Sequence, residues 1–272
     1  MGPNVVMSLM MIPFLMVGHN VHSASFQFDN LQFYTKDISL QGDAFISNGT
    51  IQLSQVALNS AGRASYAAPI HLWDAETGDL AWFTTTFSFI VGPAATTTFG
   101  DGISFFLSPF PSILPTNSAG GFLGLFSAET ALNAYENQIV AVEYDTYGNP
   151  WDPPSAHIGI NINSIASATS ETLPSVNVGS GLTAFATVNY EPNAKNLSVV
   201  VTYPQFNVNV ESSVSVSLWF LVDLRTVLPE WVSVGFSGAT GQRSRSLSGF
   251  PTICSTRNLG RLRVEIAGNP LD

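Results

Sequence analysis

Alternation of polar and apolar residues runs through much of this chain. It is clearest in residues 83–91 (FTTTFSFIV) and 197–203 (LSVVVTY), and it is already present in Ser25–Phe28. Successive side chains of a β-strand point to opposite faces, so a period of two is typical of strands with one buried face. Clusters of Gly, Pro, Asn and Ser separate these segments, and helical periodicity is hard to find. The sequence therefore predicts an all-β sandwich or barrel.

The composition supports one ordered domain and excludes several other classes. Hydrophobic residues make up 45% of the 272 residues and charged residues only 10%, which is the reverse of a disordered chain. Helical bundles and coiled coils need far more Glu and Lys than this. There are 9 basic residues against 19 acidic ones, so few groups could neutralise nucleic-acid phosphates. Because neither a repeat nor a linker interrupts the pattern, we expect one domain that binds no nucleic acid.

Most aromatic residues are expected in the interior of such a sandwich. The chain has 19 Phe and 5 Trp, and large apolar side chains on strands are mostly buried. The residues that we place in the core on this basis are Phe87, Phe89, Phe105, Phe106, Trp219 and Trp231.

The first 23 residues have the features of a secretory signal peptide. Residues 5–17 form an uncharged apolar run that is shorter than the about 20 residues of a membrane-spanning helix. Val21 and Ser23 provide β-branched and small residues at the −3 and −1 positions, and we predict cleavage after Ser23. The remaining sequence has no apolar run of spanning length, so we expect a secreted chain without a membrane span.

Two glycosylation sequons agree with a secretory route. They are Asn48-Gly49-Thr50 and Asn196-Leu197-Ser198, and they predict N-linked glycans at Asn48 and Asn196. We expect the product in the extracellular space or in a vacuole such as a protein storage vacuole.

One short stretch carries a pattern of metal ligands. Residues 139–165 read IVAVEYDTYGNPWDPPSAHIGININSI. Glu143 and Asp145 share a face of a predicted strand, where two carboxylates repel each other unless a cation lies between them. Oxygen ligands suit calcium, and carboxylates with one imidazole suit a transition metal such as manganese. The candidate ligands for two ions are Glu143, Asp145, Tyr147, Asn149, Asp152 and His157.

Other interpretations of this stretch are excluded at single positions. An EF-hand loop that begins at Asp145 needs Gly and Glu where the chain has Pro150 and Ala156. The Glu-x-Asp-x-Glu strand of a sandwich-fold glycosidase would begin at Glu143, but Tyr147 replaces its second catalytic carboxylate. A solvated turn does not need six metal-capable positions within fifteen residues. The chain also lacks a recognisable Ser-His-Asp arrangement, and we predict that it is not an enzyme.

The same stretch closely resembles the metal-binding signature of the legume lectins. That signature is Val-Glu-(Phe/Tyr)-Asp-Thr followed by Asn, Trp-Asp-Pro and His-(Ile/Val)-Gly-Ile, and the resemblance extends to about Gly241. Supporting segments are Gln41–Ala44, Ala68–Trp73, Phe99–Leu107, Gly120–Phe126 and Val227–Gly238. The resemblance implies a jelly-roll sandwich with a flat back sheet, a curved front sheet and a small bridging sheet. It also implies a metal-dependent lectin that binds cell-surface or free glycans and forms homodimers or homotetramers.

The resemblance assigns roles to individual residues. The ligands of manganese or another transition metal would be Glu143, Asp145, Asp152 and His157. The ligands of calcium would be Asp145, Asp152, Asn149 and the carbonyl group of Tyr147. Asp101 would accept hydrogen bonds from sugar hydroxyls, and Gly121 and Asn149 would donate N–H groups to the sugar. The ring of Tyr147 would stack on the apolar face of the sugar.

Two details of the resemblance bear on sugar binding. The family has a cis peptide bond before the aspartate that matches Asp101, and Gly100 stands where the family usually has Ala, which would loosen the loop. The short loop 149–152 and the sequence Trp-Asp-Pro-Pro at 151–154 follow the galactose and N-acetylgalactosamine binders, so we predict that specificity. The alternative is a lectin-like seed defence or storage protein with weakened or lost sugar binding, and the intact ligand set argues against it.

The C-terminal segment departs from the family pattern. The family ends in an apolar-aromatic strand, whereas residues 242–272 hold five of the nine basic residues and the only cysteine, Cys254. We therefore divide the chain into a signal peptide (1–23), a lectin domain (24–241) and a divergent segment (242–272) that replaces the usual last strand. Both a divergent tail and an altered reading frame would explain this shift in composition. A lost strand would leave a gap in its sheet, with unpaired backbone groups on both sides.

Overall fold

The computed structural model describes residues 24–28, 36–55, 57–91, 100–174, 182–207, 210–241, 252–254 and 262–267. The predicted signal peptide lies outside these residues. Their regular structure is almost entirely β-strand, with short 3-10 helices at η2 (Gly120–Phe122) and η3 (Leu224–Thr226). Within the ranges just given, no helix is long and apolar enough to cross a membrane.

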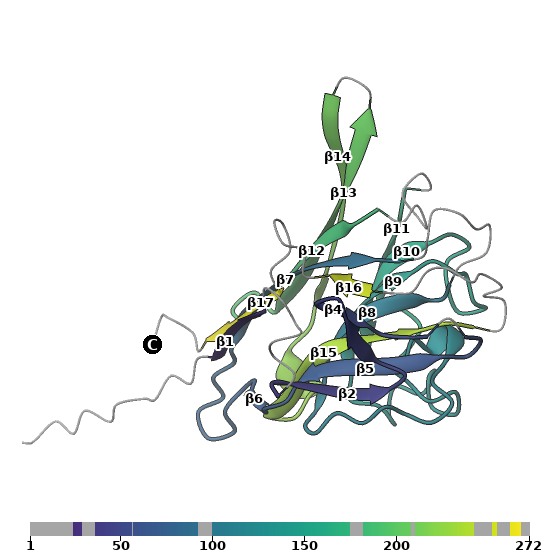
Figure 1. Cartoon of the computed structure of the whole chain (residues 1–272). Coiled ribbons are helices and arrows are strands. Elements are labelled where there is room, and N and C mark those ends of the chain that lie inside the picture. Colours follow the sequence, from purple (N-terminus) through teal and green to yellow (C-terminus); the bar gives the residue numbers. More distant parts are fainter. Residues whose placement is uncertain are drawn as a thin grey trace, which may run out of the picture.

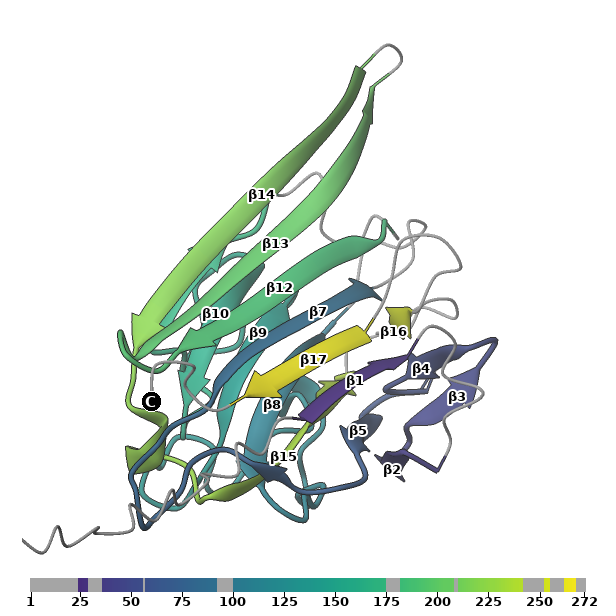
Figure 2. The same ribbon diagram turned by 90° about the vertical axis from the view of Figure 1, so that its left-hand side faces the viewer.

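The strands form two antiparallel sheets that pack face to face (Figures 1 and 2). The nine-stranded sheet consists of β1 (Ala24–Phe28), β3 (Phe45–Ser47), β4 (Thr50–Gln52), β7 (Trp82–Ile90), β12 (Ala184–Glu191), β13 (Asn196–Asn207), β14 (Val210–Leu221), β16 (Thr252–Cys254) and β17 (Leu262–Ala267). The eight-stranded sheet consists of β2 (Ile38–Gly42), β5 (Ala61–Tyr66), β6 (Ile70–His71), β8 (Gly102–Pro109), β9 (Val140–Asp145), β10 (His157–Ile162), β11 (Thr169–Thr172) and β15 (Trp231–Ala239). This architecture confirms the predicted all-β sandwich.

The small bridging sheet is not a separate element in the described part of the chain. Its place is taken by short strands that are continuous with the two large sheets: β6 pairs with the first residues of β15, and the β3–β4 hairpin joins the nine-stranded sheet through β16. In Figure 1 the β13–β14 hairpin extends well beyond the sandwich.

The main core lies between the two sheets, where the period of two directs apolar side chains. Phe83, Phe87 and Phe89 point inward from β7 and are buried. Phe87 meets Phe236 of β15 with 4.8 Å between ring centroids, in an edge-on arrangement that aromatic rings favour. Phe105 of β8 lies 6.2 Å from Phe87 by the same measure. Aromatic contacts between β7, β8 and β15 therefore connect the two sheets within a core that also contains many aliphatic side chains.

The prediction for the aromatic core is correct for the phenylalanines and wrong for the two tryptophans. Phe106 is buried too, but in a second apolar cluster on the other face of the eight-stranded sheet. Trp219 is 62% exposed because it alternates with inward Leu218 and so faces outward from β14. Trp231 is 47% exposed and stacks on His71, with 4.4 Å between ring centroids.

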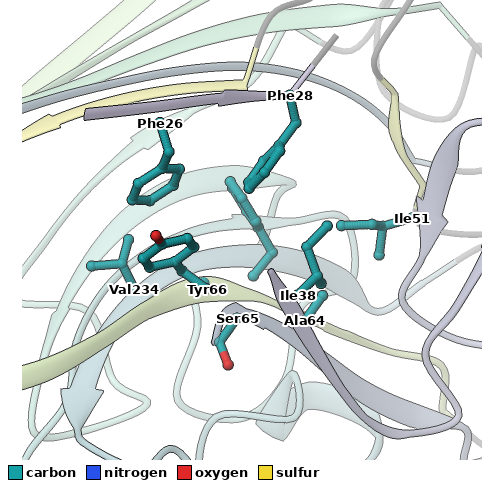
Figure 3. Close-up of a pocket in the computed structure, with 10 residues that line it drawn as sticks. Phe26, Phe28, Ile38, Ile51, Ala64, Ser65, Tyr66 and Val234 are labelled. Carbon is teal, nitrogen blue, oxygen red and sulfur yellow. The ribbon is translucent and has the colours of Figure 1, made fainter. Parts of the chain in front are cut away.

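The gap that a lost last strand would leave is absent from the described structure, because β16 and β17 both pair with β7. β17 lies between β1 and β7, with Val264 opposite Phe26 on one side and Thr85 on the other. β16 pairs with the other end of β7 and with β4. This pairing holds β1 over the eight-stranded sheet, where the ring of Phe26 stacks on that of Tyr66 with 4.1 Å between ring centroids. Both rings line a small apolar cavity (Figure 3). The divergent segment thus supplies strands to the sheet.

Candidate functional site

The predicted site residues gather at one end of four neighbouring strands of the eight-stranded sheet, where β9 and β15 end and β8 and β10 begin. Antiparallel pairing sets this arrangement: Gly102 lies opposite Asp145 and Ala239, and His157 lies opposite Asp145. Asp101 directly precedes β8 in the chain. The register of three strand pairs therefore brings together side chains that are far apart in the sequence.

Glu143, Asp145 and His157 form the buried floor of the site. All three are at most 1% exposed, and Nε2 of His157 lies 3.3 Å from Oε1 of Glu143. The same Oε1 accepts a hydrogen bond from Ser167 Oγ, and Gly159 makes room for this contact because a Cβ there would overlap both atoms. Glu143 Oε2 and Asp145 Oδ2 find no hydrogen-bond partner among the described residues. Two buried carboxylate oxygens are therefore left for another partner.

The loop from Tyr147 to Asp152 covers this floor with further oxygen atoms. Asp145 Oδ1 accepts a hydrogen bond of 2.7 Å from the N–H of Tyr147, and Asp152 Oδ2 accepts one of 2.8 Å from the N–H of Asn149. The side-chain oxygen of Asn149 faces the Tyr147 carbonyl and Asp152 Oδ2 at 3.1 Å, and only a turned amide would donate to them. In the orientation described, three oxygen atoms of Tyr147, Asn149 and Asp152 face one another with no hydrogen-bond donor between them. A hard cation such as calcium binds such a set of oxygen atoms.

The electrostatics of the site also call for a cation. Burial raises the pKa of Asp145 well above its usual value, and the charge of Glu143 adds to this effect. Burial also raises the pKa of Asp101 to about 7 and that of Asp152 to about 6. Burial lowers the pKa of His157, but its hydrogen bond to Glu143 and the charge of that carboxylate outweigh this and raise it. Each shift shows that positive charge would stabilise the ionised carboxylates.

The predicted ligands fit metal binding through a mixed set of donors. In the described part of the chain, no three His, Cys, Asp or Glu side chains alone form a group that could hold a metal. The converging donors instead include the carbonyl of Tyr147 and the amide of Asn149, which belong to calcium chemistry. Nδ1 of His157 lies 3.3 Å from the Ser155 carbonyl. This contact leaves Nε2 to act as the ligand of a transition metal.

Asp101 lies beside this loop with one carboxylate oxygen free. It follows a cis peptide bond with Gly100, as the resemblance predicted, and its N–H donates to the carbonyl of Ala239 at 3.0 Å. Asp101 is buried, and within the described ranges its Oδ2 has no hydrogen-bond partner. Gly241 and Gly120 lie against this oxygen, where a Cβ on Gly241 would approach to 2.5 Å. Oδ2 is therefore an enclosed acceptor that is packed against two glycine residues.

Gly120 and Gly121 lie between Asp101 and the loop from Tyr147 to Asp152. The N–H of Gly120 donates to the carbonyl of Thr240 at 3.1 Å, which places Gly121 directly against the side chain of Asn149. The next residue, Phe122, stacks on Trp151 with 5.1 Å between ring centroids. All the residues predicted to bind metal and sugar therefore lie in one continuous group.

The comparison with known families agrees with this geometry. The family model for the legume lectin domain matches residues 23–249. The chain belongs to the legume lectin family. Its relatives are lectins, which bind carbohydrate without catalysing its conversion.

Individual lectins are similar to this chain over most of their length. Lectin 7 of Medicago truncatula is 55% identical over 242 residues, which cover 87% of this chain and 90% of that protein. Among solved structures, the metal-free form of lectin I-B4 from Griffonia simplicifolia is 36% identical, with a TM-score of 0.75 over 90% of this chain and 99% of that one. The Bauhinia forficata lectin in complex with GalNAc is 32% identical, with a TM-score of 0.74 over 92% and 100%.

Some residues of this lectin site were not found from the sequence. Ser167 contacts Glu143 from beyond β10, and Gly241 packs on Asp101 from the end of β15. The stack of Phe122 on Trp151 joins two loops that are separate in the chain. The aromatic residues beside the predicted Gly121 and Asp152 were a usable signal, whereas a serine and a glycine without a motif were not.

The two sequons of this lectin lie in different surroundings. Asn48 is exposed at the turn between β3 and β4, and its φ of +52° is typical of such turns. Asn196 is the half-buried first residue of β13, and its Oδ1 is enclosed without a hydrogen-bond partner in the described chain. The geometry therefore favours Asn48 as the more accessible glycosylation site.

Proposed function

We propose that this chain is a metal-dependent lectin that binds galactose-type or N-acetylgalactosamine-type glycans beside Asp101, Gly121 and Asn149. The Oδ2 atom of Asp101 carries the proposal, because a buried acceptor without a partner in the described chain is suited to the hydroxyl groups of a neutral sugar. The ring of Tyr147, which lies against Gly100 next to Asp101, would pack against the apolar face of the sugar. These groups bind the sugar by hydrogen bonding and stacking and carry out no bond breaking.

Metal ions support this site from beneath. Calcium would be held by Asp145, Asp152, Asn149 and the Tyr147 carbonyl. A transition metal such as manganese would be held by Glu143, Asp145, Asp152 and His157, and these side chains would move together around the ion, because no three of them are grouped closely enough in the described structure. The ions supply the positive charge that the buried carboxylates lack. The side chains of Asn149 and Tyr147 are thereby fixed in place before sugar arrives, which lowers the entropic cost of binding.

The specificity proposal rests on the short loop between Asn149 and Asp152 and on one solved relative. The Bauhinia forficata lectin, whose complex contains GalNAc, aligns over 92% of this chain. In this chain the N–H of Asp152 donates to the carbonyl of Asn149 at 3.0 Å, which closes the loop tightly.

We further propose a homodimer or homotetramer that travels through the secretory pathway to the extracellular space or a vacuole. The outer face of the nine-stranded sheet supports self-association. Exposed Trp219 of β14 and Val200 of β13 lie there among uncharged serine and threonine side chains. Several sugar sites on one assembly would raise avidity for cell-surface glycans.

Affinity chromatography tests the proposed function. The mature protein, shown to be folded by circular dichroism, should be retained on immobilised galactose with calcium and manganese, and EDTA should release it. The variant Asp101→Asn should pass through the column while keeping its metal-dependent thermal stability, because the amide cannot accept on both atoms. A folded protein that binds none of galactose, mannose and fucose would contradict the proposal and favour a storage or defence protein without sugar binding.

A further inference from the structure

Arg63 of β5 is a buried cation without an acidic partner. Its side chain is among the buried ones, with 2% exposure, and it forms no ion pair with any carboxylate in the described part of the chain. Its guanidinium carbon lies 4.7 Å from the centre of the Phe106 ring, in a cation–π contact. Burial lowers its pKa to about 10, so it remains charged at neutral pH. A buried charge of this kind must be compensated by hydrogen bonds.

The acceptors of Arg63 belong to two segments that flank a single loop. Nη1 donates to Ser112 Oγ at 2.9 Å and to the Ile113 carbonyl at 3.0 Å. Nε donates to the carbonyl of Gly124 at 2.6 Å, and Nη2 donates to that of Leu125 at 2.7 Å. The guanidinium therefore closes the base of the loop 112–125.

Two glycines of that loop lie against the proposed sugar-binding residues. Gly120 lies against Asp101 Oδ2, and Gly121 lies against the side chain of Asn149. The loop is also closed internally, because the N–H of Gly124 donates to the carbonyl of Ser118 at 2.7 Å. Movement at the base of the loop would therefore shift Gly121 relative to Asp101.

We propose that Arg63 is a positioning residue of the sugar site, which holds Gly121 in place independently of the metal ions. This inference rests on the proposed function. Asn149 and Tyr147 would be supported by bound metal ions from the side of β9 and β10, whereas Arg63 supports the loop 112–125 from β5. The guanidinium of Arg63 donates four hydrogen bonds to acceptors in the loop 112–125. The planar guanidinium of arginine can make all four at once, whereas the ammonium group of lysine cannot.

The decisive test compares sugar and metal affinity in the variants Arg63→Lys and Arg63→Met. Both are measured by titration calorimetry with galactose and with calcium, at a temperature where circular dichroism shows a fully folded protein. We expect galactose affinity to fall by at least about tenfold in both variants, because Lys keeps the charge but loses the fork. Calcium affinity should remain unchanged within the error of the measurement.

A matched control separates positioning from general stability. Tyr190→Phe removes the buried hydrogen bond of 3.0 Å from Tyr190 to the Val222 carbonyl, which lies outside the loop 112–125. This variant should lower the melting temperature and leave galactose affinity unchanged. Unchanged galactose affinity in the folded Arg63 variants, or an equal loss of sugar and calcium affinity, would overturn the proposal.

A second variant and a second readout keep the test decisive. If the Arg63 variants do not fold, Ser112→Ala removes one acceptor and should weaken galactose binding by a smaller factor. Hydrogen exchange of the Gly120 and Gly121 amides should accelerate in every variant that loosens the loop, with or without sugar. A wild-type protein that binds no sugar would contradict the proposed function. The role of Arg63 in holding the loop would still be supported if the Gly120 and Gly121 amides exchange slowly in the wild type and faster in the variants. Unaltered exchange in a folded variant would contradict that role.

Discussion

Gly121 lies so close to Asn149 that a Cβ atom on Gly121 would overlap the Asn149 side-chain amide. These two residues belong to different loops, one clamped at its base by Arg63 and the other built around the candidate metal ligands. Their contact is the point where the two halves of the site meet. The proposed sugar site therefore contains a contact that only a glycine permits.

Substituting Gly121 by Ala should weaken sugar binding without unfolding the protein. The added methyl group would displace the loop or Asn149, and such overpacking typically costs about 1–3 kcal/mol, which corresponds to roughly 5- to 150-fold in affinity if it is lost from sugar binding. Titration with galactose measures this effect. The control is Gly78→Ala, in a turn where the nearest atom to the new Cβ belongs to Arg225. Gly78→Ala should cost stability but no affinity, and an equal loss of affinity in both variants would contradict the prediction.

Replacing Asp145 by Asn should abolish stabilisation by metal ions without destabilising the metal-free protein. The amide keeps an acceptor for the N–H of Tyr147, but it loses the free oxygen that we assign to both ions. The loss of metal affinity should exceed the roughly 10–100-fold seen for residues that only support a ligand. In EDTA the variant should melt no lower than the wild type, because the substitution removes a carboxylate whose pKa is raised by burial and by Glu143. A much lower melting temperature in EDTA would show that the carboxylate has a structural role instead.

Stabilisation by calcium and manganese should be larger at about pH 7.5 than at about pH 5. Burial raises the pKa of Asp101 to about 7 and that of Asp152 to about 6. Between the usual and the raised pKa the metal-free folded state binds more protons than the unfolded state, so its free energy of unfolding falls as the pH rises. Bound cations remove this penalty and also bind more tightly once their ligands are ionised. Differential scanning fluorimetry with and without EDTA checks this, and an equal shift at both pH values would refute it.

The shared face of Glu143 and Asp145, the candidate metal ligands on β9, could be predicted from the sequence because this arrangement is local. Residues two apart on a strand share a face whatever the rest of the fold does, and Glu143 and Asp145 do so here. Asp101 and Gly121 came only from the family resemblance, since nothing local connects either residue to the metal loop. Their places depend on the strand register and on the loop 112–125.

Other features of the fold could not be predicted because they depend on tertiary packing. A single arginine in a strand is usually solvated, and Arg63 is buried only because the loop 112–125 covers that face of β5. Trp219 is hydrophobic by type, but its partners in the alternation, Ser215 and Ser217, indicate an outward face. The polar composition of residues 242–272 did not suggest that this segment contains a strand. β17 nevertheless lies between β1 and β7, where backbone pairing on both sides stabilises it despite that composition.

N-linked glycosylation should occur at Asn48 and not at Asn196. Asn48 is exposed at a hairpin turn, whereas the Asn196 amide is half-buried at the start of β13. Glycosylation needs the side-chain nitrogen to be reachable on the surface. Mass spectrometry of protein secreted from eukaryotic cells, before and after removal of glycans, should show a shift in the wild type and in Asn196→Gln but none in Asn48→Gln. A glycan retained in Asn48→Gln would disprove this assignment.

Deleting residues 262–272 should sharply destabilise the protein. The deletion removes β17, so β1 loses its antiparallel partner and the first half of β7 loses its partner on one side, keeping β12 on the other. Unpaired N–H and C=O groups would then face a gap inside the nine-stranded sheet, a situation that promotes aggregation. Phe26 and Phe28 would also lose the support that keeps β1 over the eight-stranded sheet, where Phe26 stacks on Tyr66.

The control for this deletion is a shorter one that removes only residues 268–272 and keeps all of β17. It should match the full-length chain in melting temperature and in elution from a gel-filtration column, whereas the longer deletion should melt lower and elute as aggregates. Because the divergent segment holds five of the nine basic residues, both deletions are compared at the same ionic strength. If the two deletions behave alike, β17 contributes nothing to stability, and the sheet must close without it.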